Sequence, residues 1–138
     1  MSGEACIVGV GETDYCRKPG SGMSQLALQL RAAVAAIADA GLSPDRIDGI
    51  MPFPNLGRAE EFAANLGCAN LRFAATIHMG GAAPAASLGA AAAAVEAGLA
   101  DYVLLPAGWN GYSGARARQT IAEDVSSIPG GAIARDYY

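Results

Sequence analysis

Four short apolar runs alternate along the chain with segments in which apolar residues recur every three or four positions. The runs are "ACIVGVGE" (residues 5–12), "RIDGIMPF" (46–53), "LRFAATI" (71–77) and "ADYVLLPAG" (100–108), bounded by glycines or prolines as buried strands are. Helical spacing fills the intervals between them. The order predicts βαβαβαβ units with right-handed crossovers, and therefore a layered α/β domain with a mainly parallel sheet.

Three helices are predicted in these intervals, and each of them ends at a glycine. The first runs through residues 24–41, where Ser24 suits the N-cap and Gly41 suits the stop. Its apolar stripe is formed by Leu26, Leu30, Val34 and Ile37. The second (58–67) and the third (85–98) likewise finish on a glycine.

The character of the chain changes after residue 109. Before it, "ADAGLSPDRIDGI" (38–50) and "AVEAGLADYVLL" (94–105) share a helix end, Ala-Gly-Leu, an aspartate and an apolar strand. Beyond it, polar, glycine and charged residues are more frequent. We therefore expect an α/β core over residues 1–109, and a loop insertion followed by the start of another helix over residues 110–138.

Composition narrows the class of protein. In a chain of 138 residues, 52% apolar but only 7% aromatic content favours one domain with small helices packed closely on a sheet. The formal charge is −4 and Lys18 is the only lysine, so nucleic acid is not expected as a partner. No targeting segment and no membrane-length apolar stretch is recognisable, so we expect a cytoplasmic protein with no membrane span.

Cysteines and titratable residues show no spacing that is typical of a metal site or a disulfide framework. Cys6, Cys16 and Cys68 are odd in number and form no CxxC pair, which favours buried small residues or free thiols. One histidine and scattered acids, among them Glu12, Asp14 and Glu123, assemble neither a metal-ligand set nor a carboxylate pair. We therefore predict no bound metal.

The turn "GVGETD" after the first run invites comparison with dinucleotide-binding loops. That fingerprint needs a third glycine where Asp14 stands, and a helix that opens directly behind it. We interpret the segment as a tight turn at a strand end, and we expect no dinucleotide cofactor.

The segment "TIHMGGAAPAAS" (76–87) joins the third run to the third helix. A helix start offers unpaired N–H groups and a partial positive charge, so the backbone of residues 80–83 can hold an anion, a thioester carbonyl or a developing enolate. Enzymes that display a nucleophile on such a turn place a serine or cysteine there, but none stands between Met79 and Ala86. Close packing of an alanine-rich helix against the sheet is the alternative explanation.

Three segments together resemble the N-terminal half of the thiolase superfamily: "IVGVGETDY", "AVAAIADAGLSPDRIDGIM" and "HMGGAAPAASLGAAAAAVEAGLADYVLL". They cover nearly the whole chain and are most similar to sterol-carrier-type thiolases and thiolase-like lipid-transfer proteins. Counting back from Asp101 in "AVEAGLAD" places Gly81 where thiolases carry their nucleophilic cysteine. The resemblance implies a thiolase-like fold that is incomplete relative to the full fold of two halves.

Two departures from the thiolases limit what the resemblance implies. Without a thiol at Gly81 no acyl-enzyme step is expected, and Cys68 lies outside the register of a replacement nucleophile. The second-half histidine and cysteine motifs are also absent, so we expect a piece of a longer protein or one part of an assembly. Thiolase-like proteins without the cysteine include aldolases that cleave β-hydroxyacyl-CoA thioesters in steroid side-chain degradation, and this sequence, with its "PGGAIARDYY" segment, is most similar to them.

The resemblance to these aldolases implies retro-aldol cleavage of a β-hydroxyacyl-CoA that carries a steroid or lipid side chain. Coenzyme A is then part of the substrate, and no bound cofactor is expected. A thiolase or acyltransferase whose thiol is supplied elsewhere is one alternative, and a non-catalytic subunit that binds acyl-CoA or stabilises a partner is another. The family also implies a homodimer formed through residues 71–77 and a small OB-fold partner protein.

The predicted substrate-binding residues are His78, Gly80, Gly81 and Ala82, and no catalytic base is identified. His78 either hydrogen-bonds the thioester oxygen or a water, or ties down its own loop. Arg116 and Arg118 either approach the phosphates of coenzyme A or form an exposed, solvated pair. Tyr137 and Tyr138 are candidates for the lining of an acyl pocket.

Overall fold

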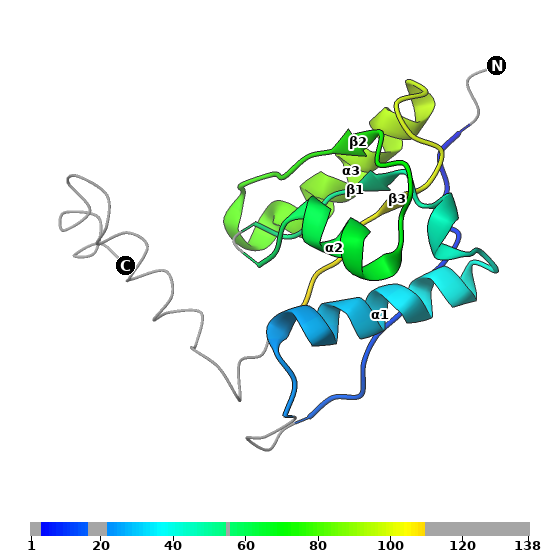
Figure 1. Ribbon diagram of the computed structural model, residues 1–138. Coiled ribbons are helices and arrows are strands. Elements are labelled where there is room, and N and C mark those ends of the chain that lie inside the picture. The colour runs from blue at the N-terminus through cyan, green and yellow to red at the C-terminus, as the bar shows by residue number, and fades with distance from the viewer. Residues whose placement is uncertain (1–3, 17–21, 55, 110–138) are drawn as a thin grey trace, which may run out of the picture. The chain divides into compact units, whose positions relative to one another are not determined.

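The computed structural model describes residues 4–16, 22–54 and 56–109, and its larger compact unit comprises Met1–Asp14 and Ser24–Trp109. The elements of this unit are α1 (Gln25–Asp39), the short 3-10 helix η1 (Pro44–Arg46), β1 (Gly49–Ile50), α2 (Ala59–Leu66), β2 (Phe73–Ala74), the 3-10 turn η2 (Gly80–Ala82), α3 (Ala83–Glu96) and β3 (Val103–Leu104) (Figure 1). The insertion and helix predicted over residues 110–138 lie outside the described residues.

The three strands form one parallel sheet in the order β2-β1-β3, as the alternating pattern predicts. Gly49 pairs with both Phe73 and Val103, so β1 is the central strand. The pairing of β1 with β3 continues past the strand ends, because Phe53 N–H donates to the Pro106 carbonyl at 3.1 Å. Parallel neighbours need crossover connections, and α2 and α3 supply them.

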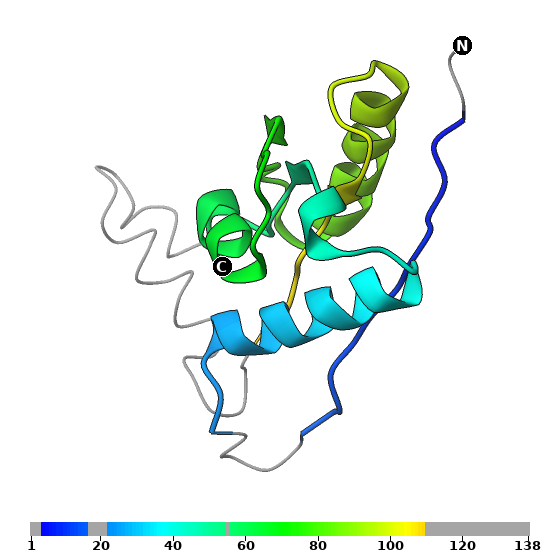
Figure 2. The same ribbon diagram turned by 45° about the vertical axis from the view of Figure 1, so that its right-hand side comes forward.

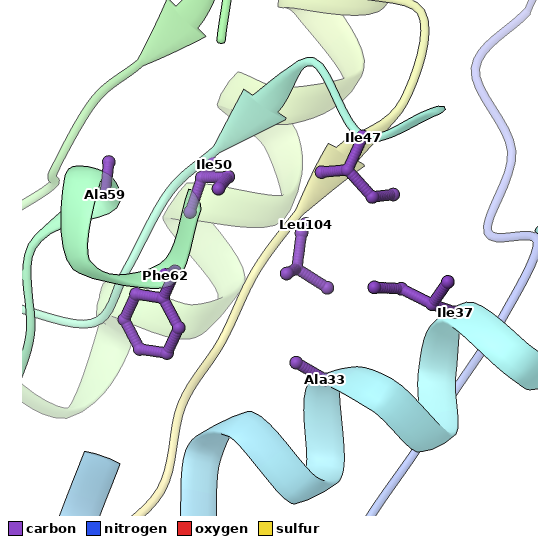
Figure 3. Close-up of a cluster of buried hydrophobic side chains, with 7 residues drawn as sticks. All are labelled: Ala33, Ile37, Ile47, Ile50, Ala59, Phe62 and Leu104. Atoms are coloured by element: carbon purple, nitrogen blue, oxygen red, sulfur yellow. The ribbon is translucent and has the colours of Figure 1, made fainter. Parts of the chain in front are cut away.

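Helices cover both faces of the sheet. Figures 1 and 2 show α1 and α2 on one side of the strands and α3 on the other. The core between the strands and the first two helices consists of Ala33, Ile37, Ile47, Ile50, Ala59, Phe62 and Leu104 (Figure 3). Phe62 and Ile50 are fully buried there, and burial of a side chain of that size stabilises the fold by about 1.5–3 kcal/mol.

The helix ends agree with the sequence prediction. Ser24 Oγ accepts a hydrogen bond from the Ala27 N–H at 3.2 Å, which caps α1. The three glycines expected to stop the helices all adopt positive φ: Gly41 at 66°, Gly67 at 77° and Gly98 at 72°. These left-handed positions suit glycine because it has no Cβ. The third helix begins at Ala83 rather than at residue 85.

The predicted apolar stripe of α1 is wrong at one position. Val34 is 52% exposed, whereas Gln29 is buried with 1% exposure. The face turned to the core runs through Gln29, Ala33 and Ile37, with Leu26 and Leu30 partly buried beside it. The Gln29 amide nitrogen donates to the Gly108 carbonyl at 3.0 Å, which offsets part of the cost of burying this polar side chain.

The first predicted strand, over residues 5–12, is not part of the sheet in the described part of the chain. This segment runs along α1 instead, and Val10 N–H donates to an Asp39 carboxylate oxygen at 2.9 Å (Figures 1 and 2). A Cβ at Gly9 or Gly11 would overlap the α1 backbone. The glycines that read as a strand end thus permit close approach to a helix, and a four-strand βαβαβαβ sheet is replaced by three strands.

An ionic cluster joins the amino ends of all three strands. The Asp48 carboxylate accepts hydrogen bonds from the backbone N–H groups of Asp101 and Tyr102 at 2.9 Å each. It also pairs with the Arg72 guanidinium at 3.0 Å, and Arg72 in turn donates to the Gly98 carbonyl at 2.9 Å. Each strand start is therefore tied to the other two on the edge away from the candidate site.

Candidate functional site

The segments that follow the three strands meet at one edge of the sheet, because carboxyl ends of parallel strands point the same way. They are residues 51–58 after β1, 75–82 after β2 and 105–109 after β3. Ligands of open α/β sheets bind outside this edge. The turn predicted to bind substrate lies in the second of these segments, and it is therefore at the chemically relevant edge.

The backbone of that turn leaves two donors available. Met79 O accepts from the Ala82 N–H at 3.1 Å, and Gly80 O accepts from the Ala83 N–H. The N–H groups of Gly80 and Gly81 have no acceptor among the described residues. Of the backbone donors predicted at residues 80–82, the free pair is thus Gly80 and Gly81, at the start of a helical turn that continues into α3.

The two glycines are not explained by packing. Apart from the adjoining residues and the backbone of the same helical turn, no atom of the described residues lies within 4 Å of the position that a Cβ at Gly81 would take, and the same holds at Gly80. Tight packing begins further along, at Ala83, which is fully buried. The alternative interpretation from the sequence, in which small residues serve close packing, therefore applies to the body of α3 and not to its glycine turn.

His78 precedes this turn and its side chain is exposed. It makes no hydrogen bond within the described part of the chain, so it does not tie down its loop there. Met79 beside it is 57% exposed. An exposed imidazole at the carboxyl edge is free to meet a ligand, which keeps the substrate-binding prediction for His78 open.

An open hollow of about 420 Å³ adjoins the same edge. Its lining consists of Gly57, Arg58, Ala59, Glu60, Ala74, Ala75 and Thr76. The start of α2 forms one wall, where Arg58 N–H donates to a Glu61 carboxylate oxygen at 3.1 Å. The other wall follows β2 and leads along the chain to His78 and the glycine turn. The Arg58 guanidinium has no ion pair with another described residue, and it adds positive charge beside the hollow.

Cys68 lies away from this edge, directly after the end of α2, and it packs against the core cluster. Burial, followed by the negative charge of Asp45, raises the pKa of the Cys68 thiol above its usual value. A thiol with a raised pKa is a poor nucleophile because the thiolate is the reactive form. The structure thus agrees with its exclusion as a substitute for the missing cysteine.

Two residues at this edge were not identified from the sequence. Gln25 Nε2 donates to the Leu56 carbonyl at 3.1 Å, and Gln29 Nε2 donates to the Gly108 carbonyl. Both carbonyls belong to segments that follow strands. The only signal in the sequence is that Gln29 interrupts an otherwise apolar face of α1.

The remaining predictions concern a metal site, a membrane span and residues near the end of the sequence. Within residues 4–16, 22–54 and 56–109 no group of three or more histidine, cysteine or acidic side chains is arranged to hold a metal ion. No helix in those ranges is both long and apolar enough to cross a bilayer. Several predicted contributors lie outside the described residues: Arg116, Arg118, Glu123, Tyr137 and Tyr138.

Comparison with known proteins identifies relatives over most of the chain. No protein-family model matches it. It is 43% identical over 119 residues to the 17-hydroxy-3-oxo-4-pregnene-20-carboxyl-CoA lyase of Mycobacterium tuberculosis, an alignment that covers 84% of this chain and 30% of the relative. It is 38% identical over 117 residues to a steroid side-chain-cleaving aldolase of Thermomonospora curvata, with 84% and 29% covered. The chain thus spans less than a third of the length of these relatives.

Solved structures with a similar fold also include an aldolase. The fold matches a chain of the Ltp2-ChsH2(DUF35) aldolase with a TM-score of 0.75 and 37% identity, over 80% of this chain and 29% of that one. A 3-oxoacyl-[acyl-carrier-protein] synthase III from Aquifex aeolicus matches with a TM-score of 0.56 and 23% identity over 64% of this chain. The second likeness supports the fold alone, which is the fold of the thiolase-like proteins.

Proposed function

Because this chain is thiolase-like and resembles steroid side-chain aldolases over most of its length, we propose that it forms part of an enzyme that cleaves a β-hydroxyacyl-CoA by retro-aldol chemistry. One observation carries the proposal. The turn that the sequence resemblance assigns to the thiolase nucleophile position has no thiol, and its Gly80 and Gly81 N–H groups have no acceptor among the described residues. It is equipped to stabilise negative charge and not to form an acyl-enzyme.

The reaction needs two functions from the protein. A base removes the proton of the β-hydroxyl group, and that oxygen becomes a carbonyl as the bond between the α- and β-carbons breaks. The electron pair of this bond moves to the thioester as an enolate, which is then protonated at its α-carbon. Donors aimed at the enolate oxygen stabilise it, and one such donor is commonly worth about 10²–10³ in rate. We assign this role to the N–H groups of Gly80 and Gly81.

The substrate class follows from the relatives. The name of the mycobacterial relative specifies a CoA thioester of a hydroxylated steroid, and that of the second specifies steroid side-chain cleavage. We therefore propose that coenzyme A is carried by the substrate and that no further organic cofactor takes part. Within this proposal His78, exposed next to the turn, contacts the thioester group or a water bound to it.

A partner protein is part of the proposal. The similar solved aldolase contains a second component, ChsH2(DUF35), beside Ltp2. We infer that this chain too works with a small partner, for which the sequence resemblance implies an OB fold. The homodimer through residues 71–77 and the cytoplasmic location stay predictions from the sequence.

A non-catalytic subunit that binds acyl-CoA is the second candidate. It is favoured by the surroundings of His78, since no acidic side chain in the described part of the chain hydrogen-bonds that imidazole and orients it as a base. The position and the raised pKa of Cys68 weaken that cysteine as the nucleophile, so the thiolase alternative needs a thiol supplied from elsewhere.

Product analysis by mass spectrometry distinguishes the three candidates. The protein, purified with the chains that accompany it, is given matched β-hydroxyacyl-CoA and β-ketoacyl-CoA substrates. Cleavage of the hydroxy compound without added coenzyme A supports the aldolase. Coenzyme A-dependent cleavage of the keto compound supports a thiolase, and no reaction with either supports a binding subunit.

A further inference from the structure

Gln29 is a polar side chain that is buried on the core-facing side of α1. Only 1% of it is exposed, among the apolar residues that α1 turns to the core. Its Nε2 donates to the Gly108 carbonyl, but its Oε1 is buried with no hydrogen-bond partner. A buried acceptor without a donor is destabilising, and native proteins retain few of them without a reason.

The amide of Gln29 lies near two segments at the carboxyl edge. Gly108, which follows β3, approaches it so closely that a Cβ there would lie 3.2 Å from Gln29 Cγ. Gly57, which follows β1, is also near, since a Cβ at Gly57 would be 3.6 Å from Gln29 Oε1. The same Gly57 lines the hollow at this edge.

Gln25, one helical turn before Gln29 on α1, also holds a segment at the carboxyl edge. Its Nε2 donates to the Leu56 carbonyl, so the segment that contains Gly57 is also held from α1. Two of the three segments at the carboxyl edge are thus fixed by side-chain amides from a single helix. The third segment, which carries Gly80 and Gly81, follows β2 and is not held in this way.

We propose that Gln29 is a positioning residue for the reaction, because its buried amide holds the chain after β3 in place at the edge where the substrate binds. This inference rests on the proposed function. Gln29 does not reach the reacting atoms itself. It acts through the Gly108 carbonyl, and an apolar side chain of the same length fills the space without holding that segment.

The test compares Gln29→Met with Ile37→Val in the protein purified with its accompanying chains. Met matches the length of Gln and removes both the donor and the unpartnered acceptor. Ile37 is buried on the same face of α1 but contacts the core cluster, so its shortening reports a loss of packing alone. Thermal midpoints, kcat and KM for the β-hydroxyacyl-CoA, and amide hydrogen exchange of residues 105–109 are measured for both variants.

We expect Gln29→Met to lower kcat about tenfold or more with KM within about threefold, since a small misplacement of groups at a site costs rate before binding. Exchange at residues 105–109 accelerates in Gln29→Met and is unchanged in Ile37→Val. Equal kcat and equal exchange in the two variants would overturn the inference. If the unaltered protein cleaves no substrate, the proposed function fails, whereas an active wild type with an unimpaired Gln29→Met variant refutes only the role of Gln29.

Discussion

Gly80 and Gly81 are neighbours in the chain, yet the structure demands glycine at only one of them. Gly80 has a φ of 53°, in the left-handed region, whereas Gly81 has no positive φ and open space where its Cβ would be. A side chain therefore fits at Gly81, and its absence is not imposed by the backbone or by packing. This agrees with the proposal that the N–H groups of the turn contact the substrate directly.

Substitution of each glycine by alanine should show that the backbone requires glycine at Gly80 and not at Gly81. Gly80→Ala is expected to lower the free energy of unfolding by about 1–2 kcal/mol, the cost of a left-handed conformation for a residue with a Cβ. Gly81→Ala is expected to be neutral or to stabilise by about 0.4–1 kcal/mol, because it restricts the unfolded chain without strain. Urea denaturation of both variants checks this. Equal destabilisation would show that the two positions do not differ as described.

Cysteine at Gly81 tests whether the turn stabilises negative charge. The thiol of Gly81→Cys should have a pKa below its usual value, because unpaired N–H groups and the helix start favour the thiolate. We expect it to react with iodoacetamide near neutral pH about tenfold faster than the thiol of Gly89→Cys. Gly89 is the matched control because it is exposed in the middle of α3, also with open space around its Cβ position. Equal rates at the two positions would refute the charge-stabilising turn.

Cys68 should react more slowly than the exposed thiol of Cys6. The pKa of the Cys68 thiol is raised by burial and by Asp45, so less of it is present as the reactive thiolate, and Cys6 is exposed whereas Cys68 is partly buried. The thiolate fraction of Cys68 grows as the pH rises through its raised pKa, so its alkylation rate should increase as the solution is made more alkaline. Peptide mapping after timed alkylation gives both rates. Faster labelling of Cys68 than of Cys6 at pH 8 would contradict its partly buried position and its raised pKa.

Asp48 should dominate the stability of the sheet's amino edge. Asp48→Ala leaves the Asp101 and Tyr102 N–H groups without their acceptor and removes the nearer carboxylate partner of Arg72, and we expect a loss of about 3 kcal/mol. Asp101→Ala is the control, because its side chain is 76% exposed and lies 3.4 Å from Arg72. Exposed pairs contribute about 0–1 kcal/mol. Similar losses in the two variants would show that the cluster does not depend on Asp48.

Local signals were sufficient for much of this fold. The Ser24 cap and the glycine stops follow from backbone chemistry within a few residues, and the parallel order follows from alternating strands and helices. The segment over residues 5–12 did not form its predicted strand, because strand formation depends on a partner that local pattern does not specify. It meets α1 instead through glycines.

The site was only partly accessible from the sequence. The glycine turn was located by its composition and its place after a strand, but which glycine needs a positive φ is a property of the folded backbone. Gln29 was missed because its partner, the Gly108 carbonyl, lies 79 positions away in the chain. Long-range hydrogen bonds of this kind leave no periodic signal, and a glutamine in an apolar stripe looks like an interruption.

The central claim is that cleavage proceeds at Gly80 and Gly81 without a covalent intermediate on this chain. The most direct test is intact-protein mass spectrometry of the complex, quenched with acid while it turns over a β-hydroxyacyl-CoA. We predict product formation with this chain at its unmodified mass at every time point. An acyl adduct that appears and decays at the rate of turnover, on Cys68 or on any other residue, would contradict the claim.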